Sequence, residues 1–304
     1  MNVTLASDAS VGLTDRIAGA QAKAAVLREA LPWLQRYAGA VVVIKYGGSA
    51  MEDHDVRAGF AADVALLHTV GLRPIVVHGG GPQISTLSRR LGLEPTFVHG
   101  LRVTDDATLE VARMVLMGQV NPDLVRLVRT GGAPSVGIAG TDGGLLRAEP
   151  ATGPAGEPLG HVGEVTQVDP TLVMKLLDDG FVPVVATIAT GPDGDLNVNA
   201  DTAAGAIAAA VGAVKLIYLT DVPGLYEDLG DEGSLVSELA LDRLRDLLAA
   251  GRLHEGMAPK ARSIIDALDA GVPHAHVLDG RVRHAVLLEI FTDEGVGTMI
   301  AGRG

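Results

Sequence analysis

Two glycine clusters are the parts of this chain best suited to chemistry. Residues 45–49 read KYGGS and residues 78–82 read HGGGP, and each cluster ends an apolar run. Glycines let backbone N–H groups converge on an anion, and the N-terminus of a following helix adds positive potential. Pro82 suits the first position of such a helix. One glycine pair would indicate only a turn, but two clusters in consecutive strand–helix units favour a phosphate site.

Neither cluster matches a common phosphate motif. The sequence contains no G-x-x-x-x-G-K-[ST], which excludes an ordinary P-loop. It also lacks G-x-G-x-x-G after the first predicted strand, so a dinucleotide-binding dehydrogenase would lack its fingerprint.

Several polar residues could act beside the glycines. Lys45 stands near the end of an apolar strand, where its ammonium could reach a bound anion or extend to solvent. In the polar loop predicted at 195–199, Asn197 and Asn199 alternate and point the same way. Asp201 or Thr202 could cap the alanine-rich helix that follows.

Two further basic residues have both functional and structural interpretations. Arg102 could bind a carboxylate through two hydrogen bonds, or it could form an ion pair on the surface. Lys260 follows Pro259 at the start of a predicted helix, and its spacing alone favours a solvent-facing side chain.

Other catalytic classes have no support in the sequence. The nine histidines include no H-E-x-x-H or other metal-ligand spacing, and no G-x-S-x-G is present. The absence of cysteine excludes disulfides, thiolate zinc sites and a cysteine nucleophile. The net charge of −13 argues against a nucleic-acid partner.

The chemistry-bearing residues fall within an α/β pattern. Apolar runs at 41–48, 73–81 and 181–188 alternate with helical patterns, which predicts a parallel sheet covered by helices on both faces. Residues 141–168 resemble strand-and-turn excursions from that sheet, and separate helices are expected at 105–117 and 122–129. The 304 residues contain 39 glycines, well above the usual share of about 7%.

The N-terminal part predicts a helix at 14–37 after a mobile tail of about 12 residues. Its apolar residues follow alternating steps of three and four, a spacing that favours a helix packed on its own domain but also fits an oligomerisation arm. The first residues do not form a secretory signal, and no apolar stretch reaches the roughly 18–20 residues that span a bilayer. A cytoplasmic protein without a membrane partner is expected.

Eight motifs, in this order, resemble those of the N-acetylglutamate kinases of the amino acid kinase superfamily. They cover roughly residues 14–300 and read KYGGSA (45–50), VVHGGGPQI (76–84), HGLRVT (99–104), GHVGEV (160–165), NVNADTAA (197–204), LTDVPGLY (219–226), GMAPKA (256–261) and DGRVRHAVLLEIFTDEGVGT (279–298). The resemblance implies ATP-dependent phosphorylation of the γ-carboxylate of N-acetyl-L-glutamate in arginine biosynthesis. It also implies an open, mainly parallel sheet between helices, with a helical N-terminal segment (1–38), an acetylglutamate lobe (39–211) and a nucleotide lobe (212–304).

The resemblance assigns roles to individual residues. Lys45, Lys260 and Asp201 would be catalytic, with Asp201 holding the two lysines. Substrate would be bound by Gly47, Gly48, Gly80, Gly81, Arg102, Asn197 and Asn199. The nucleotide would lie near Thr220, Asp221, Gly224, Leu225, Tyr226, Gly256 and Met257. Mg²⁺ would arrive with ATP, without a metal site of the protein's own.

Family members with such an N-terminal helix resemble arginine-inhibited hexamers built as trimers of dimers. The resemblance therefore implies a regulatory L-arginine site at Tyr37, Lys215, His276, Glu289 and Gly295. A carbamate or glutamate kinase of the superfamily and a non-catalytic arginine sensor are the alternatives. Loss of the lysines or of Asp201 would have favoured the sensor.

Overall fold

An eight-stranded sheet forms the centre of the computed structural model, which describes residues 13–47, 53–98, 101–153, 155–226, 232–253, 257–292 and 295–302. The strand order is β14-β16-β15-β11-β1-β2-β8-β5. The strands from β15 to β5 are parallel, and β16 runs antiparallel to β15. Their bounds are β1 Val41–Tyr46, β2 Arg73–His78, β5 Ser135–Ala139, β8 Val182–Ala186, β11 Lys215–Thr220, β14 Glu238–Ala240, β15 His274–Asp279 and β16 Thr298–Ala301.

The central strands are apolar throughout because both faces of the sheet are covered. In β1, Val41 and Val43 pack into one core, and Val42 and Ile44 pack into the other. The first core lies under α6 (Thr171–Asp178), α7 (Ala200–Ala210), α8 (Leu241–Ala249) and α9 (Met257–Asp269). The second lies under α2 (His54–Thr69), α3 (Gly81–Arg90), α4 (Asp106–Val115), α5 (Asn121–Gly131) and α10 (Ala285–Phe291). The predicted fold class is confirmed.

Smaller strands extend from one end of the sheet, as predicted for residues 141–168. A closed barrel contains β6 (Leu146–Thr152), β7 (Pro158–Val168), β9 (Ile188–Thr190) and β10 (Asp195–Val198). The hairpin of β3 (Phe97–Val98) and β4 (Leu101–Arg102) lies nearby, and β12 (Leu225–Tyr226) pairs with β13 (Leu235–Val236). The predicted polar loop before α7 is in part a strand, because β10 is held on both sides by β7 and β9.

The helices predicted at 105–117 and 122–129 are not separate. A π-helical segment, Leu116–Val120, joins α4 to α5 without a break. A π-helical turn inserts an extra residue and turns the following side chains toward a different face. The residue placed by this turn is Asn121, at the start of α5 and almost fully buried.

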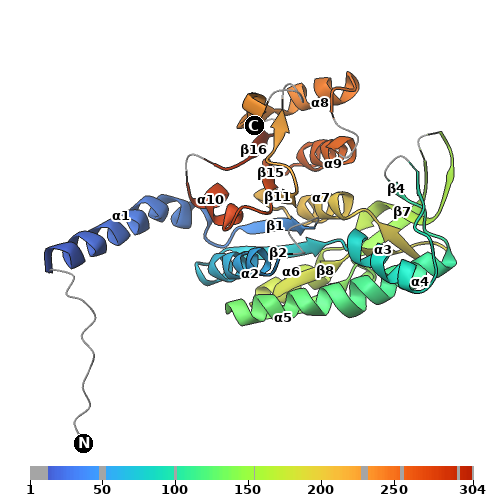
Figure 1. Cartoon of the computed structure of the whole chain (residues 1–304), viewed down its shortest axis with the longest axis horizontal. Helices are drawn as coiled ribbons and strands as arrows, with labels where there is room; N and C mark the ends of the chain where they lie inside the picture. Colours follow the sequence, from blue (N-terminus) through green and yellow to red (C-terminus); the bar gives the residue numbers. More distant parts are fainter. Residues whose placement is uncertain are drawn as a thin grey trace, which may run out of the picture.

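Helix α1 (Leu13–Tyr37) projects away from the rest of the molecule (Figure 1). The predicted apolar stripe of α1 consists of Ile17, Ala20, Ala24, Leu27, Leu31 and Leu34. Within it, Ile17, Leu27 and Leu31 are 49%, 69% and 49% exposed. Only its last turns reach the body, where Tyr37 is buried and Trp33 packs against the second core. The preference for a helix packed on its own domain was therefore wrong for most of α1.

The predicted lobe boundary at 211/212 falls between α7 and β11. Strand β11 pairs directly with β1, so the sheet runs through this boundary without interruption. The division into lobes stays a prediction. No helix in the described ranges is both long and apolar enough to cross a membrane.

Candidate active site

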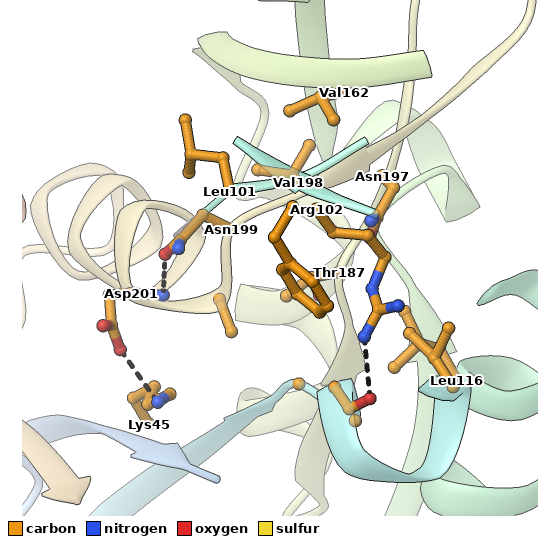
Figure 2. Close-up of a pocket in the computed structure, with 16 residues that line it drawn as sticks. Lys45, Leu101, Arg102, Leu116, Val162, Thr187, Asn197, Val198, Asn199 and Asp201 are labelled. Carbon is orange, nitrogen blue, oxygen red and sulfur yellow. Dashed lines mark hydrogen bonds and ion pairs between the residues drawn. The ribbon is translucent and has the colours of Figure 1, made fainter. Parts of the chain in front are cut away.

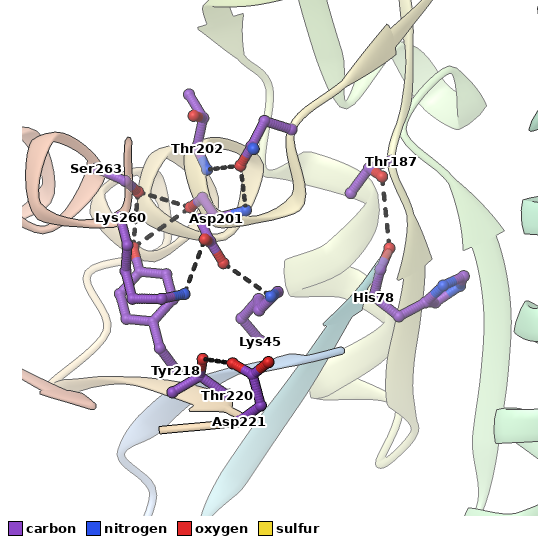
Figure 3. A network of polar contacts seen from close by, with 11 residues as sticks. Lys45, His78, Thr187, Asp201, Thr202, Tyr218, Thr220, Asp221, Lys260 and Ser263 are labelled. Atoms are coloured by element: carbon purple, nitrogen blue, oxygen red, sulfur yellow. Dashed lines mark hydrogen bonds and ion pairs between the residues drawn. The ribbon is translucent and has the colours of Figure 1, made fainter. Parts of the chain in front are cut away.

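A buried carboxylate lies between two ammonium groups at the carboxyl ends of the central strands. Asp201 Oδ1 is 2.9 Å from Lys45 Nζ, and its Oδ2 is 2.8 Å from Lys260 Nζ (Figure 3). The three residues come from β1, α7 and α9. The Lys45 side chain is only 13% exposed, and that of Lys260 is 5% exposed. Lys45 therefore does not extend to solvent, and Lys260 is not a solvent-facing lysine.

Asn199, not Asp201 or Thr202, caps helix α7. Its side-chain oxygen accepts hydrogen bonds from the backbone N–H groups of Asp201 and Thr202, at 2.8 and 3.3 Å. This frees the Asp201 carboxylate, in the first helical turn, to face the lysines. The capping prediction for Asp201 was wrong by two residues.

The backbone of Asp201 is fixed by two groups that the sequence did not single out. Ser263 Oγ donates to the Asp201 carbonyl at 2.6 Å and lies 2.7 Å from the Tyr218 hydroxyl. The Tyr218 ring also lies 4.9 Å from Lys260 Nζ, within the range of a cation–π interaction. Ser263 is three residues after Lys260, on the same face of α9, and that spacing was the available sequence signal.

The two lysines strongly perturb the ionisation of Asp201, and Asp201 perturbs that of Lys260. Burial alone would raise the pKa of Asp201, but the nearby Lys45 and Lys260 outweigh it and hold that pKa well below its ordinary value. Burial lowers the pKa of Lys260, and the negative charge of Asp201 opposes this fall. The arrangement can therefore present positive charge to an anion in a site largely removed from water.

A cavity of about 230 Å³ opens beside this cluster (Figure 2). Lys45, the segments 79–81 and 197–201, and the β3–β4 hairpin with Arg102 contribute to its wall. Thus Lys45 of the first predicted strand–glycine unit and the glycines of the second line one cavity at the carboxyl edge of the sheet. Such edges are where open α/β sheets bind ligands.

Arg102 lines this cavity and is not a surface ion-pair partner. Its Nη2 donates to the Gly81 carbonyl at 2.9 Å and to Ser85 Oγ at 2.7 Å. The guanidinium lies 4.7 Å from the centre of the Phe97 ring. Its buried Nη1 has no hydrogen-bond partner within the described part of the chain. A buried donor without a partner is costly, so this end of Arg102 is suited to a carboxylate ligand.

Asn197 and the glycines occupy the remaining wall. Asn197 Nδ2 donates to Thr104 Oγ1 at 3.3 Å. A Cβ at Gly47 would lie 3.0 Å from Lys45 Nζ, and one at Gly80 would lie 2.8 Å from a Leu116 methyl carbon. A side chain at either position would therefore require Lys45 or Leu116 to shift. Gly48 falls outside the described residues.

The predicted nucleotide residues lie on the other side of Lys45. Thr220 ends β11, the strand beside β1, and its hydroxyl donates to the adjacent Asp221 carboxylate at 3.2 Å. Gly224, Leu225 and Tyr226 follow, and Met257 begins α9. Gly256 is outside the described residues.

A second cavity, of about 330 Å³, brings together all five residues of the predicted regulatory site: Tyr37, Lys215, His276, Glu289 and Gly295. Lys215 Nζ lies 2.9 Å from His276 Nε2, and His276 Nδ1 lies 2.7 Å from Glu289 Oε1. Burial lowers the pKa of Lys215 to about 8. Trp33 and Arg36, at the end of α1, also line this cavity and were not predicted.

The chain matches the model of the amino acid kinase family over residues 40–279. It is 54% identical to an acetylglutamate kinase of Acidothermus cellulolyticus, over 92% of this chain and 97% of that protein. It is 52% identical to an acetylglutamate kinase of Saccharopolyspora erythraea, over 96% and 97%.

A solved N-acetylglutamate synthase from Neisseria gonorrhoeae is also similar, with one structure complexed with coenzyme A and N-acetyl-glutamate and another with coenzyme A and L-arginine. The first has a TM-score of 0.81 at 26% identity and covers 92% of this chain and 64% of the synthase. The second has a TM-score of 0.78 at 25% identity and covers 92% and 66%. The matches along nearly whole chains at about half identity show that this chain belongs to the amino acid kinase family and, within it, to the acetylglutamate kinases.

Proposed function

We propose that the chain transfers the γ-phosphoryl group of ATP to the γ-carboxylate of N-acetyl-L-glutamate, a step of arginine biosynthesis. The observation that carries this proposal is the Lys45–Asp201–Lys260 cluster beside a cavity that is also lined by Arg102 and by the glycine segment 79–81. The acetylglutamate kinases to which the chain is similar, at about half identity, support it.

Each group in the cavity has a role in that reaction. The free Nη1 of Arg102, with Asn197, binds the α-carboxylate of the acceptor and so directs its γ-carboxylate toward the lysines. Lys45 and Lys260 neutralise charge on the transferring phosphoryl group, whose loose transition state needs positioning and electrostatic stabilisation. Asp201 aligns the two lysines and accepts no proton.

The acceptor needs no general base, because a carboxylate is already ionised near pH 7. The nucleotide lies toward Thr220–Tyr226 and the start of α9. Mg²⁺ bound to the phosphates of ATP would shield their negative charge from the attacking carboxylate. The cationic groups at this site suit phosphate oxygens: Lys45 and Arg102 line the cavity, and Lys260 lies against Asp201.

A substrate comparison tests the proposal. ADP release should be rapid with N-acetyl-L-glutamate and ATP–Mg²⁺, and far slower with free glutamate or with carbamate. Equal or faster turnover of glutamate or carbamate would instead make the chain another small-molecule kinase of the family. An absence of turnover with all three acceptors, combined with binding of arginine, would favour a non-catalytic sensor.

We also propose that L-arginine binds the second cavity and inhibits the enzyme. The Glu289 carboxylate would pair with the guanidinium, and it is already held by His276 and by the backbone N–H of Val296 at 2.9 Å. Burial raises the pKa of Glu289, but its contacts with His276 outweigh this, so the carboxylate stays ionised. The synthase of similar structure that was solved with L-arginine supports this assignment.

The exposed stripe of α1 supports a hexamer built as a trimer of dimers, in which α1 helices of neighbouring dimers cover one another. The stripe consists of Ile17, Ala20, Ala24, Leu27, Leu31 and Leu34. The part of it between residues 15 and 29 is solvent-exposed in the single chain. Exposed apolar area of this kind indicates a protein interface.

Two truncations should separate assembly from arginine binding. Removal of residues 1–29 takes away most of the exposed stripe but keeps Trp33, Arg36 and Tyr37, so we expect a smaller oligomer that still binds arginine with weakened inhibition. Removal of residues 1–37 also takes away Trp33, Arg36 and Tyr37, so we expect the same smaller oligomer with much weaker arginine binding. Sedimentation velocity and calorimetric titration with arginine measure the two effects. A hexamer of equal arginine sensitivity after the shorter truncation would contradict the role of α1.

A further inference from the structure

Two buried polar side chains, His78 and Asn121, lie next to the second glycine cluster and take no direct part in the proposed reaction. His78, at the end of β2, is fully buried. Its Nδ1 lies 2.9 Å from the carbonyl oxygen of Gly79, and its Nε2 lies 3.0 Å from Nδ2 of Asn121. Figure 3 shows the His78 ring directed away from the Lys45–Asp201–Lys260 cluster. The ring therefore contacts the backbone of the second glycine cluster on the side away from these three charged residues.

The partners of Asn121 determine which nitrogen of His78 carries the proton. Asn121 Nδ2 is 2.8 Å from the carbonyl of Val184, and that contact requires a donor. The same amide nitrogen therefore donates to His78 Nε2, which must be unprotonated. Burial lowers the pKa of His78 to about 4, so the ring is neutral near pH 7. Its single proton is on Nδ1 and is donated to the Gly79 carbonyl.

This hydrogen bond sets the direction of the next N–H group. In a planar trans peptide the C=O of one residue and the N–H of the following residue point in opposite directions. A Gly79 carbonyl held toward the His78 ring sends the N–H of Gly80 away from the ring. Because Gly79, Gly80 and Gly81 line the active-site cavity and His78 is not among its lining residues, this direction leads toward the cavity.

The π-helical segment Leu116–Val120 contacts the second glycine cluster and also places Asn121, the partner of His78. Leu116 and Val120 pack against Gly80, where a Cβ would lie 2.8 and 3.3 Å from their methyl carbons. The next residue is Asn121, which lies against β5. A Cβ at Gly137 would come within 1.9 Å of Asn121 Oδ1, so only glycine leaves room for this side chain. The same turn thus positions both the glycine loop and the partner of His78.

We propose that His78 is a positioning residue that, in the Nδ1–H form selected by Asn121, aims the Gly80 N–H at the anion bound in the active-site cavity. The inference rests on the proposed function for the identity of that anion. A glycine peptide has few steric limits on its orientation, and its reversal would present a carbonyl oxygen to the anion. The His78 hydrogen bond prevents this reversal without contact with the substrate.

A matched pair of variants tests the role of the Nδ1 proton. Asn and Leu have the same branched shape, but only His78→Asn keeps a donor near the position of Nδ1. We expect kcat to fall by about 10-fold in His78→Asn and by about 100-fold or more in His78→Leu, the size of loss caused by a small misplacement of reacting groups. The KM for ATP should change little in either. Thermal melts of both variants establish that the difference does not arise from unfolding.

Nitrogen-15 NMR of the unaltered full chain gives a readout that does not depend on activity. We expect the His78 signals of a neutral ring protonated at Nδ1. A ring protonated at Nε2, or equal losses of kcat in two folded variants, would overturn the proposal. If the unaltered chain does not phosphorylate acetylglutamate, the proposed function fails, and the NMR tautomer alone then decides whether His78 has the form assigned here.

Discussion

Replacement of Lys45 by alanine should lower kcat by about two to three orders of magnitude, comparable to the loss of one oxyanion-hole donor. Lys45 contributes one of the two ammoniums at the site and is held 2.9 Å from Asp201. A charge that acts on the transition state affects turnover more than substrate binding, so KM for ATP and for the acceptor should change much less. Initial-rate measurements of both substrates give this separation.

The matched control for this variant is Lys175→Ala. Lys175 is 73% exposed and pairs with Asp179 on the surface at 3.5 Å, so its removal should leave kcat unchanged. Turnover of Lys45→Ala close to that of the control would show that Lys45 is not part of the catalytic machinery.

Asp201→Asn should affect both turnover and stability. The substitution leaves Lys45 and Lys260 buried side by side without their shared carboxylate, and breaking a buried ion pair costs about 3–5 kcal/mol of folding free energy. The loss of lysine alignment should lower kcat by about 100-fold or more. Denaturant unfolding and steady-state kinetics measure the two effects separately, with the exposed Asp179→Asn as the control.

The same variant has a specific pH dependence. Burial lowers the pKa of Lys260 and the charge of Asp201 partly restores it, so removal of that charge lowers this pKa further. The ammonium form of Lys260 is then lost at a lower pH. The alkaline limb of the kcat–pH profile should shift to lower pH in Asp201→Asn. An unshifted limb would mean that Lys260 does not act as a cation in the rate-limiting step.

The sequence predicted the α/β class well, because continuous apolar strands are stable chiefly in a sheet whose two faces are both covered. It also located both strand–glycine units, and Lys45 of the first and the glycines of the second line one cavity. It could not place Lys260 from spacing, because a lysine in the first turn of a helix is ordinarily exposed. Its burial depends on the long-range packing of α9 against α7.

The remaining errors have similar causes. Asn199 and Asp201 are both good N-cap residues, and in the structure Asn199 caps α7 while Asp201 pairs with the two lysines, which are distant in sequence. The stripe of α1 has the same spacing whether it faces its own domain or another chain. His78 and Asn121 are 43 positions apart, and no local pattern connects them.

The central position of β1 has a consequence for how the enzyme matures during synthesis. Strand β1 leaves the ribosome before both of its neighbours, and β11 follows only after β2, β5 and β8 have been made. The partners of Lys45 lie on α7 and α9, so the charged cluster forms only when the chain through α9 has been made. Contacts between such distant segments form slowly, and fragments released early expose apolar strands. Prematurely terminated chains are therefore inactive from the outset and become targets for chaperones and proteases.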